Sequence, residues 1–169
     1  MKILNGVAIV CAAGILYSCS MGKMAMKKAD KKFKYGEYEY AIEDYTKAIE
    51  RDYEIGEAYF QIGESYRLSN RIKKAGDYYQ KALANNYPQD AARFYYALSL
   101  TANEKYDEAT QALNELIEEG EDEQYLELAR WQLDNIRKAQ SLYQAESFFR
   151  VRNLASINSP GAEYSPVYQ

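Results

Sequence analysis

The chain has 169 residues, the length of one small domain. Its 21 basic and 25 acidic side chains give a formal net charge of −4, which argues against a general nucleic-acid binder. It has no histidine, so the commonest general base and metal ligand are missing. Two cysteines allow at most one disulfide, whereas 18 tyrosines are an excess that the fold has to explain.

The N-terminus has the pattern of a secretory signal. Lys2 gives a short positive start, and residues 3–17 are uncharged, mostly apolar and too short for a spanning helix of about 20 residues. Residues 16–19 (LYSC) resemble a lipobox, the bacterial lipoprotein cleavage site, although Tyr17 is larger than usual at its place. The resemblance implies a signal peptide over 1–18, lipidation of Cys19 and a tether over 19–22. The alternatives are a plain signal peptide and an anchor helix that is never cut.

The residues after the cysteine predict a location. Ser20 stands where a retained inner-membrane lipoprotein of a diderm bacterium would carry aspartate, so the resemblance implies the outer membrane. No acidic cluster follows Cys19, and in Bacteroidetes lipoproteins such a cluster tends to mark surface export. We therefore expect a chain that is lipid-anchored in the outer membrane and faces the periplasm.

Residues 23–149 carry an internal period of 34 residues in three copies without an insertion. Two classes of position hold small residues and a third holds large ones. These classes are Ala29, Gly63 and Ala97; Ala41, Ala75 and Ala109; and Tyr45, Tyr79 and Leu113. A 34-residue period with small residues at two fixed places is typical of the tetratricopeptide repeat (TPR).

Each copy is expected to form a hairpin of two antiparallel helices. Because a single hairpin cannot bury its apolar face, neighbouring hairpins are expected to stack. A seventh helix, from about 123 to 149, would cap the last repeat. The sequence thus predicts an all-α fold, a TPR solenoid of about three repeats with a C-terminal capping helix. The six hairpin helices are expected at about 22–34, 38–51, 55–69, 72–85, 89–102 and 106–119.

The tail, residues 150–169, has no helical period and by composition alone is a linker. Residues 157–160 (INSP) and 163–167 (EYSPV) resemble the junction between TPRs and a TolB-like β-propeller. That junction occurs in Bacteroidetes lipoproteins of the OmpA family, which include the PorE-like components of type IX secretion. The chain ends at Gln169, before any propeller, so we expect the N-terminal piece of such a protein or a split-gene product.

The first helices of TPR hairpins line a concave face, which is the usual binding surface. Exposed aromatic residues there favour a partner peptide or helix, and the alternative is that they belong to the core or lie under the last helix. A chaperone-tail clamp is not expected, because Gln61 and Tyr95 stand where that clamp needs asparagine. The candidate groove residues are Phe33, Phe60, Glu64, Arg67, Phe94 and Leu98.

Charge is segregated along the chain. Residues 19–34 hold six lysines and one acid, Asp30, whereas residues 104–123 hold nine acids and one lysine, Lys105. The basic cluster either reaches anionic headgroups or is a solvated helix face. The acidic run 118–123 lacks the ligand spacing of a calcium loop and favours the start of the next helix.

No catalytic residue, metal site or cofactor is expected, because the sequence has no phosphate-binding loop and no nucleophile elbow. We expect a non-enzymatic scaffold with protein partners in the cell envelope, attached to the outer membrane by lipid, without nucleic acid or small-molecule substrate. The resemblance implies a role in or near type IX secretion, gliding or envelope anchoring. The alternatives are a TPR lipoprotein of outer-membrane β-barrel assembly and a groove-type peptide-binding module.

Overall fold

The structure is a computed structural model that describes residues 20–87 and 90–144. The signal segment, Cys19, Pro88 and everything from residue 145 onward lie outside the described residues, so the predictions made for them stay predictions. Within the described ranges the chain forms seven helices and no strand. The helices are residues 20–34, α2 (Tyr38–Ile49), α3 (Ile55–Leu68), α4 (Ile72–Ala84), α5 (Asp90–Ala102), α6 (Tyr106–Glu119) and α7 (Glu123–Gln144).

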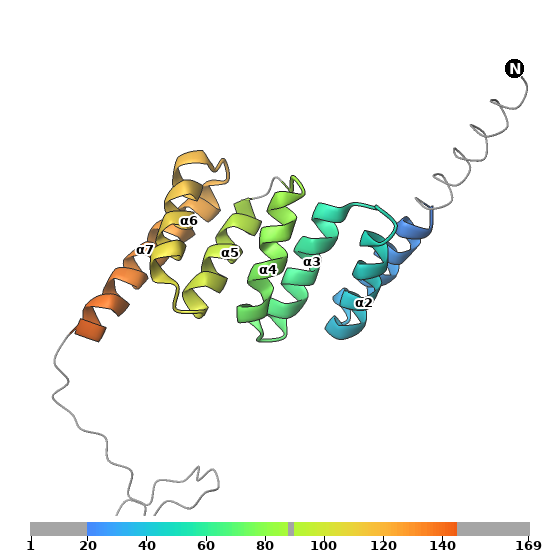
Figure 1. Ribbon diagram of the computed structural model, residues 1–169, viewed down its shortest axis with the longest axis horizontal. Coiled ribbons are helices and arrows are strands. Elements are labelled where there is room, and N and C mark those ends of the chain that lie inside the picture. The colour runs from blue at the N-terminus through green and yellow to red at the C-terminus, as the bar shows by residue number, and fades with distance from the viewer. Residues whose placement is uncertain (1–19, 88–89, 145–169) are drawn as a thin grey trace, which may run out of the picture.

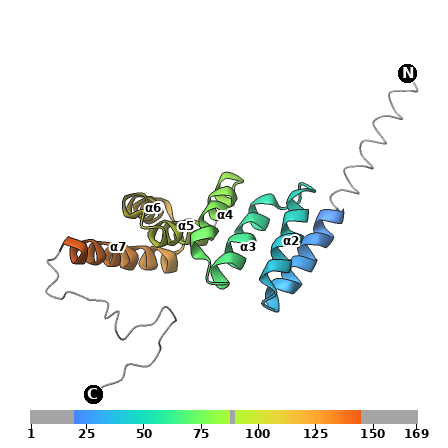
Figure 2. The ribbon, with the colours of Figure 1, turned by 60° about the horizontal axis from the view of Figure 1, so that its bottom comes forward.

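The helices form antiparallel hairpins that stack in a row (Figure 1). From α2 onward each helix contacts its neighbours in chain order, and α5 additionally contacts α7. The first helix lies at one end of the row and α7 at the other, as Figure 2 also shows. The predicted all-α TPR solenoid of three hairpins and a capping helix is confirmed, with helix bounds within two residues of those expected wherever the chain is described.

The turn inside each hairpin recurs with the same period. One residue per turn adopts the left-handed conformation: Gly36, Asn70 and Glu104, with φ of 76°, 60° and 61°. The next residue then donates its N–H to a carbonyl five residues back, which closes the helix end in the Schellman manner. These bonds run from Glu37 to Lys32, from Arg71 to Tyr66 and from Lys105 to Leu100, at 2.9–3.0 Å.

The small residues of the repeat lie where helices approach most closely. At Gly63 a Cβ atom would lie 2.7 Å from the Tyr79 ring, so the first and second helices of this hairpin are in direct contact there. Tyr79 and its repeat equivalents Tyr45 and Leu113 have no exposed surface. All six small residues are buried as well: Ala29, Ala41, Gly63, Ala75, Ala97 and Ala109. Buried tyrosines thus account for part of the tyrosine excess.

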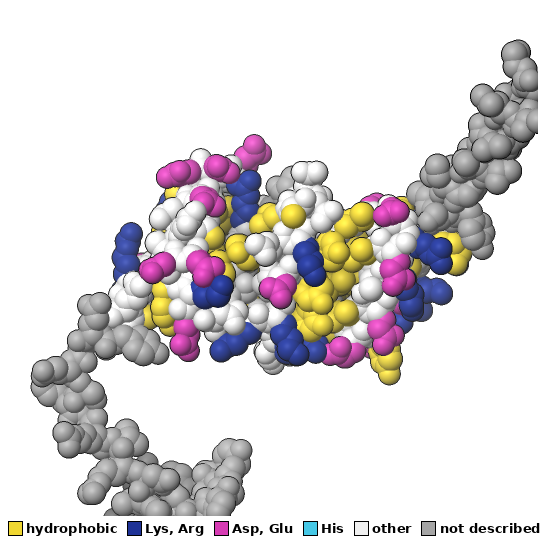
Figure 3. All heavy atoms as spheres, viewed as in Figure 1, with side chains coloured by type: hydrophobic (Ala, Val, Ile, Leu, Met, Phe, Trp, Pro, Cys, Tyr) yellow, Lys and Arg dark blue, Asp and Glu magenta, His cyan; other side chains and the backbone are white. Residues whose placement is uncertain are grey.

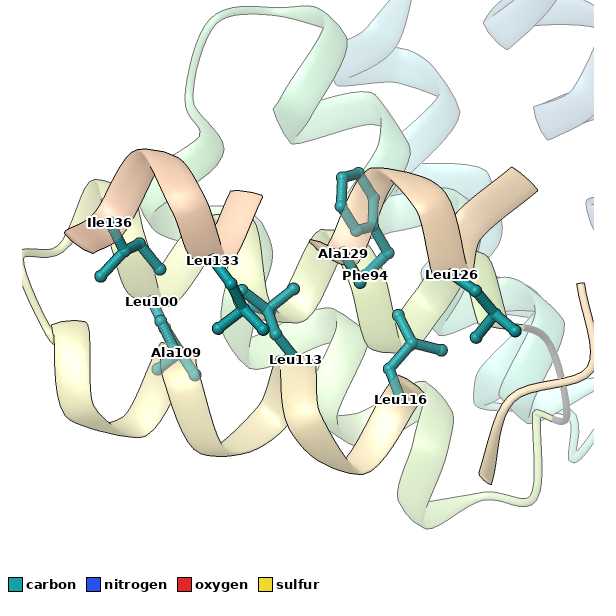
Figure 4. Packing of buried hydrophobic residues seen from close by; sticks show 10 residues of the cluster. Phe94, Leu100, Ala109, Leu113, Leu116, Leu126, Ala129, Leu133 and Ile136 are labelled. Carbon is teal, nitrogen blue, oxygen red and sulfur yellow. The ribbon is translucent and has the colours of Figure 1, made fainter. Parts of the chain in front are cut away.

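Helix α7 covers the last hairpin. Its Leu126 points toward Leu116 and its Leu133 toward Leu113 of α6, whereas Ile136 lies over Leu100 and Ala109 (Figure 4). Residue 131 falls on the small-residue class, 34 positions after Ala97, yet it is a tryptophan with 62% of its surface exposed. A helix could not cross α7 closely at that side chain, and among the described residues none does. Among the described residues helix α7 therefore caps the last hairpin.

Candidate functional site

Two predicted groove residues are core residues. Phe60 is 8% exposed, and its ring stacks on Tyr87 with the ring centroids 4.6 Å apart. Phe94 is 5% exposed and lies 5.9 Å from the ring of Tyr125. The prediction that these two rings line an open groove is wrong, because Tyr87 after α4 and Tyr125 of α7 fold onto them.

Phe33 and Leu98 are half-buried and also serve packing. Phe33 meets Tyr38 of α2 edge to face, with the centroids 5.6 Å apart. Leu98 packs against the cluster that α5, α6 and α7 build around Leu113. Both side chains contact neighbouring residues of the core. The apolar residues of the predicted groove therefore pack the helices together.

Glu64 and Arg67 belong to a polar and aromatic cluster that joins four helices. Arg67 Nε donates to Glu64 Oε1 at 2.8 Å, and the Tyr79 hydroxyl donates to the same oxygen at 2.6 Å. The Arg67 guanidinium lies 4.3 Å above the Tyr95 ring, which stacks on Tyr79. Tyr125 of α7 meets Tyr95 edge to face at 6.2 Å. We call this cluster of Glu64, Arg67, Tyr79, Tyr95 and Tyr125 the tyrosine surface.

The electrostatics of the tyrosine surface fix its charge state. Burial raises the pKa of the Tyr79 hydroxyl, and the Glu64 carboxylate raises it further, so Tyr79 is a neutral donor at physiological pH. The hydrogen bond to Glu64 raises the pKa of Arg67, which keeps the guanidinium charged. Burial, followed by the neighbouring Tyr95, raises the pKa of Tyr125. The cluster therefore offers hydrogen-bond donors, a stacked cation and aromatic faces.

The Glu64–Tyr79 bond has a counterpart one repeat earlier. The Tyr45 hydroxyl donates to Asp30 at 3.0 Å, and Asp30 and Tyr45 precede Glu64 and Tyr79 by 34 residues each. The third repeat has Leu98 and Leu113 at these places. The sequence points to Glu64 and to both tyrosines separately, but the pairing of acid with tyrosine is visible only in the structure. The signal was available, because acid and tyrosine change to leucine together.

A second surface feature lies beside α5. A cavity of about 460 Å³ is lined by Leu83, Tyr87, Tyr96 and Ala112, with Arg93 at its rim. Arg93 occupies the repeat position that Tyr59 fills in the previous hairpin. Its guanidinium bonds Glu119 at 3.3 Å instead of filling the space between α4 and α6. The hollow is thus the space that a large aromatic residue would fill.

The described residues contain no cluster of three or more acids, cysteines or histidines that could hold a metal ion. Among the same residues every buried side-chain nitrogen and oxygen has a hydrogen-bond partner. No helix in this part of the chain is long and apolar enough to cross a membrane. What the described surface offers is therefore aromatic and charged contact area.

Several solved TPR domains share this fold. The first TPR of Spaghetti (RPAP3) bound to an HSP90 peptide has a TM-score of 0.59 at 22% identity, over 73% of this chain and 98% of that one. The Sgt2 TPR domain of Aspergillus fumigatus has a TM-score of 0.60 at 19% identity, over 83% and 93%. The Yersinia enterocolitica type III secretion chaperone SycD, in complex with a peptide of the translocator YopD, has a TM-score of 0.58 at 16% identity, over 73% and 94%. No family model and no curated protein matches the sequence.

Proposed function

We infer that this chain is a non-enzymatic TPR scaffold that binds a segment of a partner protein. The observation that carries this conclusion is the tyrosine surface, which joins α3, α4, α5 and α7. Its Tyr95 and Tyr125 rings are half-buried. Its one carboxylate, that of Glu64, already accepts hydrogen bonds from Arg67 and Tyr79. Tyrosine and arginine are enriched in protein interfaces, where they supply large contact area at low entropic cost.

The internal bonds of the tyrosine surface favour a preformed site. Arg67 is held by Glu64 and by the Tyr95 ring, so little side-chain entropy remains to be lost on binding. Leu68, one residue further, is 41% exposed and shares a helix face with Glu64. A partner helix or strand with an apolar residue would contact Leu68 and the tyrosine rings together.

Peptide partners of similar folds support this class of function. The RPAP3 and SycD domains have been solved with peptides. An HSP90-type partner is not proposed for this chain. Gln61, at the place of a clamp asparagine, donates its amide to Glu57 at 2.8 Å, and Tyr95 at the other place stacks under Arg67.

We further propose that the scaffold is a lipoprotein of the outer membrane that faces the periplasm, with Cys19 as its anchor. The support is the sequence alone: the lipobox-like residues 16–19, followed by Ser20. The propeller-junction resemblance of residues 157–167 favours work in or near type IX secretion, gliding or envelope anchoring. A role in outer-membrane β-barrel assembly is the second candidate, because TPR lipoproteins also serve there.

Site-specific photocrosslinking tests the binding surface. A photoreactive residue at Leu68 should crosslink to one envelope protein in living cells, and adding Tyr95→Ala should abolish that product. The same residue at Gln80, exposed on α4, is the matched control and should give no such product. Equal crosslinking from Leu68 and Gln80, or a Leu68 product that survives Tyr95→Ala, would remove the tyrosine surface as the binding site.

Membrane fractionation tests the anchor separately. Cys19→Ala should move the protein from the membrane fraction to the soluble periplasmic fraction, because stable attachment needs acyl chains. Ser18→Thr changes the neighbouring residue and leaves the cysteine in place, so it serves as the control. A Cys19→Ala protein that stays with the membrane after washing at high salt would contradict the lipoprotein assignment.

A further inference from the structure

The first helix, residues 20–34, has two faces of opposite character. Met26 and Ala29 are buried against α2 and α3, and Phe33 is half-buried beside them. At 100° per residue the other side of the helix carries five lysines within one arc, and all five are exposed. We call Lys23, Lys27, Lys28, Lys31 and Lys34 the lysine face.

The positive charge of the lysine face is not neutralised within the described residues. The ion pairs found there include only one lysine of this helix, Lys32, which bonds the buried Asp44 and does not belong to the face. Asp30, the helix's one acid, accepts the hydroxyl of Tyr45. Lys28 lines a hollow of about 170 Å³ with Glu50, the residue after α2, without forming an ion pair. Five lysine charges are thus presented from one helix surface, with the single carboxylate of Asp30 at its edge.

Two exposed methionines accompany these lysines. Met21 is 38% and Met24 is 52% exposed, although methionine is usually a core residue. By helical geometry Met24 falls between Lys31 and Lys28 on the wheel, so apolar and basic groups alternate on one surface. Although the apolar face of this helix is packed inside the protein, the two methionines can contact the headgroup boundary while the lysines reach lipid phosphates.

The opposite end of the solenoid carries the opposite charge. Residues 104–123, which comprise α6, its flanking loops and the first residue of α7, hold nine acids and one lysine. Figure 3 shows acidic side chains gathered over α6 at one end, whereas at the end of the first helix basic side chains appear with acidic ones beside them. An anionic surface would attract the first end and repel the second.

We propose that the lysine face docks on anionic phospholipid headgroups and that the solenoid thereby stands with its α6–α7 end away from the bilayer. Phospholipid is favoured over an acidic protein because exposed methionines lie among the lysines. The proposal goes beyond the scaffold function and does not depend on lipidation, since the lysine face itself carries the contact.

The test measures binding of residues 20–169 to vesicles. This chain keeps every described helix, and all three hydrophobic clusters lie within residues 25–136, so it retains the fold. The vesicles contain phosphatidylcholine with about one-third phosphatidylglycerol, and pure phosphatidylcholine is the uncharged reference. Binding should be confined to the anionic vesicles and should weaken with salt.

Paired lysine substitutions locate the contact. Lys27→Gln with Lys31→Gln removes two charges from the centre of the lysine face. The partition coefficient should fall about 30-fold, which corresponds to about 1 kcal/mol for each lysine at about 1.4 kcal/mol per tenfold. Lys73→Gln with Lys74→Gln removes two exposed charges from α4 and should change binding less than about twofold.

Three outcomes would overturn the proposal: equal losses in both double variants, equal binding to charged and uncharged vesicles, or no vesicle binding at all. If the lysine face instead contacts the acidic end of a second copy, residues 20–169 would self-associate in a Lys27- and Lys31-dependent way without binding vesicles. Failure of the vesicle assay leaves the Cys19→Ala and Leu68 experiments unaffected, so the two sets of conclusions stand or fall separately.

Discussion

The second and third repeats place the same backbone around different chemistry. In the second, Tyr79 is locked to Glu64 by a 2.6 Å hydrogen bond and is surrounded by aromatic rings. In the third, Leu98 and Leu113 take the two places and join an aliphatic cluster with α7. Both hairpins keep the small residue at the helix crossing, Gly63 or Ala97.

The comparison separates the residues that the fold requires, at the helix crossing, from the pair beside the crossing, which can vary. The crossing residue must be small because the partner helix lies against it, whatever the neighbouring side chains are. The pair beside the crossing must only match: acid with tyrosine, or leucine with leucine. A buried hydroxyl without an acceptor costs about 1–3 kcal/mol, so the members of a pair have to change together.

The largest effect is expected from introducing the tyrosine of the acid–tyrosine pair into the third repeat without its acid. Leu113→Tyr should destabilise the fold by about 3 kcal/mol, because it overfills a fully buried site and buries a hydroxyl facing Leu98. Adding Leu98→Glu should recover about 1 kcal/mol by supplying the acceptor. Chemical denaturation of both single variants and the double variant gives the coupling energy. A coupling energy of zero would mean that the pair works only within the second repeat.

Removing the hydroxyl from the second repeat should have a medium effect. Tyr79→Phe keeps the ring and loses one bond to a carboxylate, which should cost about 1–2 kcal/mol. Tyr40→Phe, on an exposed ring of α2, is the matched control and should leave stability unchanged.

The Tyr79→Phe variant should also differ from the unsubstituted chain in how its stability depends on alkaline pH. The folded-state pKa of Tyr79 is raised above the ordinary value of about 10. Its contribution is therefore fully present below pH 10 and is lost as the pH rises toward the folded-state value. Stability of Tyr79→Phe should fall less steeply above pH 10 than that of the unsubstituted chain, as urea unfolding across the pH range would show. Parallel curves would contradict the burial of an ionisable hydroxyl.

A smaller effect extends the comparison to the first repeat. Asp44 is buried and accepts bonds from Lys32 and Lys47, both at 2.6 Å, at the place of Tyr78 and Ala112 in the later repeats. Burial opposes its ionisation, but the two lysines outweigh burial and hold the pKa of Asp44 below its ordinary value. Asp44→Asn should cost about 1 kcal/mol at neutral pH, since both lysines are partly solvated.

The acid side of the stability profile checks this pair. Because the folded-state pKa is lowered, the contribution of Asp44 is present above the unfolded value near 3.8 and disappears as the pH falls through the folded value. The stability gap between Asp44→Asn and the unsubstituted chain should therefore close below pH 3.8. Asp77→Asn, an exposed acid of α4, should show no gap at any pH.

The smallest effect is expected at Trp131, which continues the repeat register but is not covered by any helix of the described residues. Trp131→Ala should change stability by less than about 0.5 kcal/mol, because most of the side chain is already in water. Leu133→Ala on the buried side of the same helix should cost about 2–5 kcal/mol. Thermal unfolding of the two variants compares them directly. A large loss at Trp131 would show that something covers it.

The fold was predictable because its strongest constraint is local and periodic. Small residues at Gly63 and Ala97 and turns at Asn70 and Glu104 recur every 34 positions, and each is required by backbone geometry. The inward or outward direction of side chains was less predictable. Phe60 was assigned to an open face because nothing in a helical period reports that Tyr87, 27 residues later, returns to cover it.

The acid–tyrosine pairs lay between these extremes. Glu64 and Tyr79 were each singled out, one as a groove residue and one as packing, and the structure shows that they act as one unit. The joint change of both positions to leucine in the third repeat is the sequence signal for this pairing. The ion pair of Lys32 and Asp44 had no such signal, since it occurs in a single repeat.

The left-handed residues Gly36, Asn70 and Glu104 also limit how this protein can change in length. One inserted residue would rotate the following helix by about 100° and turn its small residue away from its neighbour. Insertions of a whole hairpin preserve every contact class, because each hairpin contacts only the next. The distance between the lysine face at one end and Trp131 at the other can therefore change only by the length of a whole hairpin. The number of repeats thus sets how far apart the two ends lie.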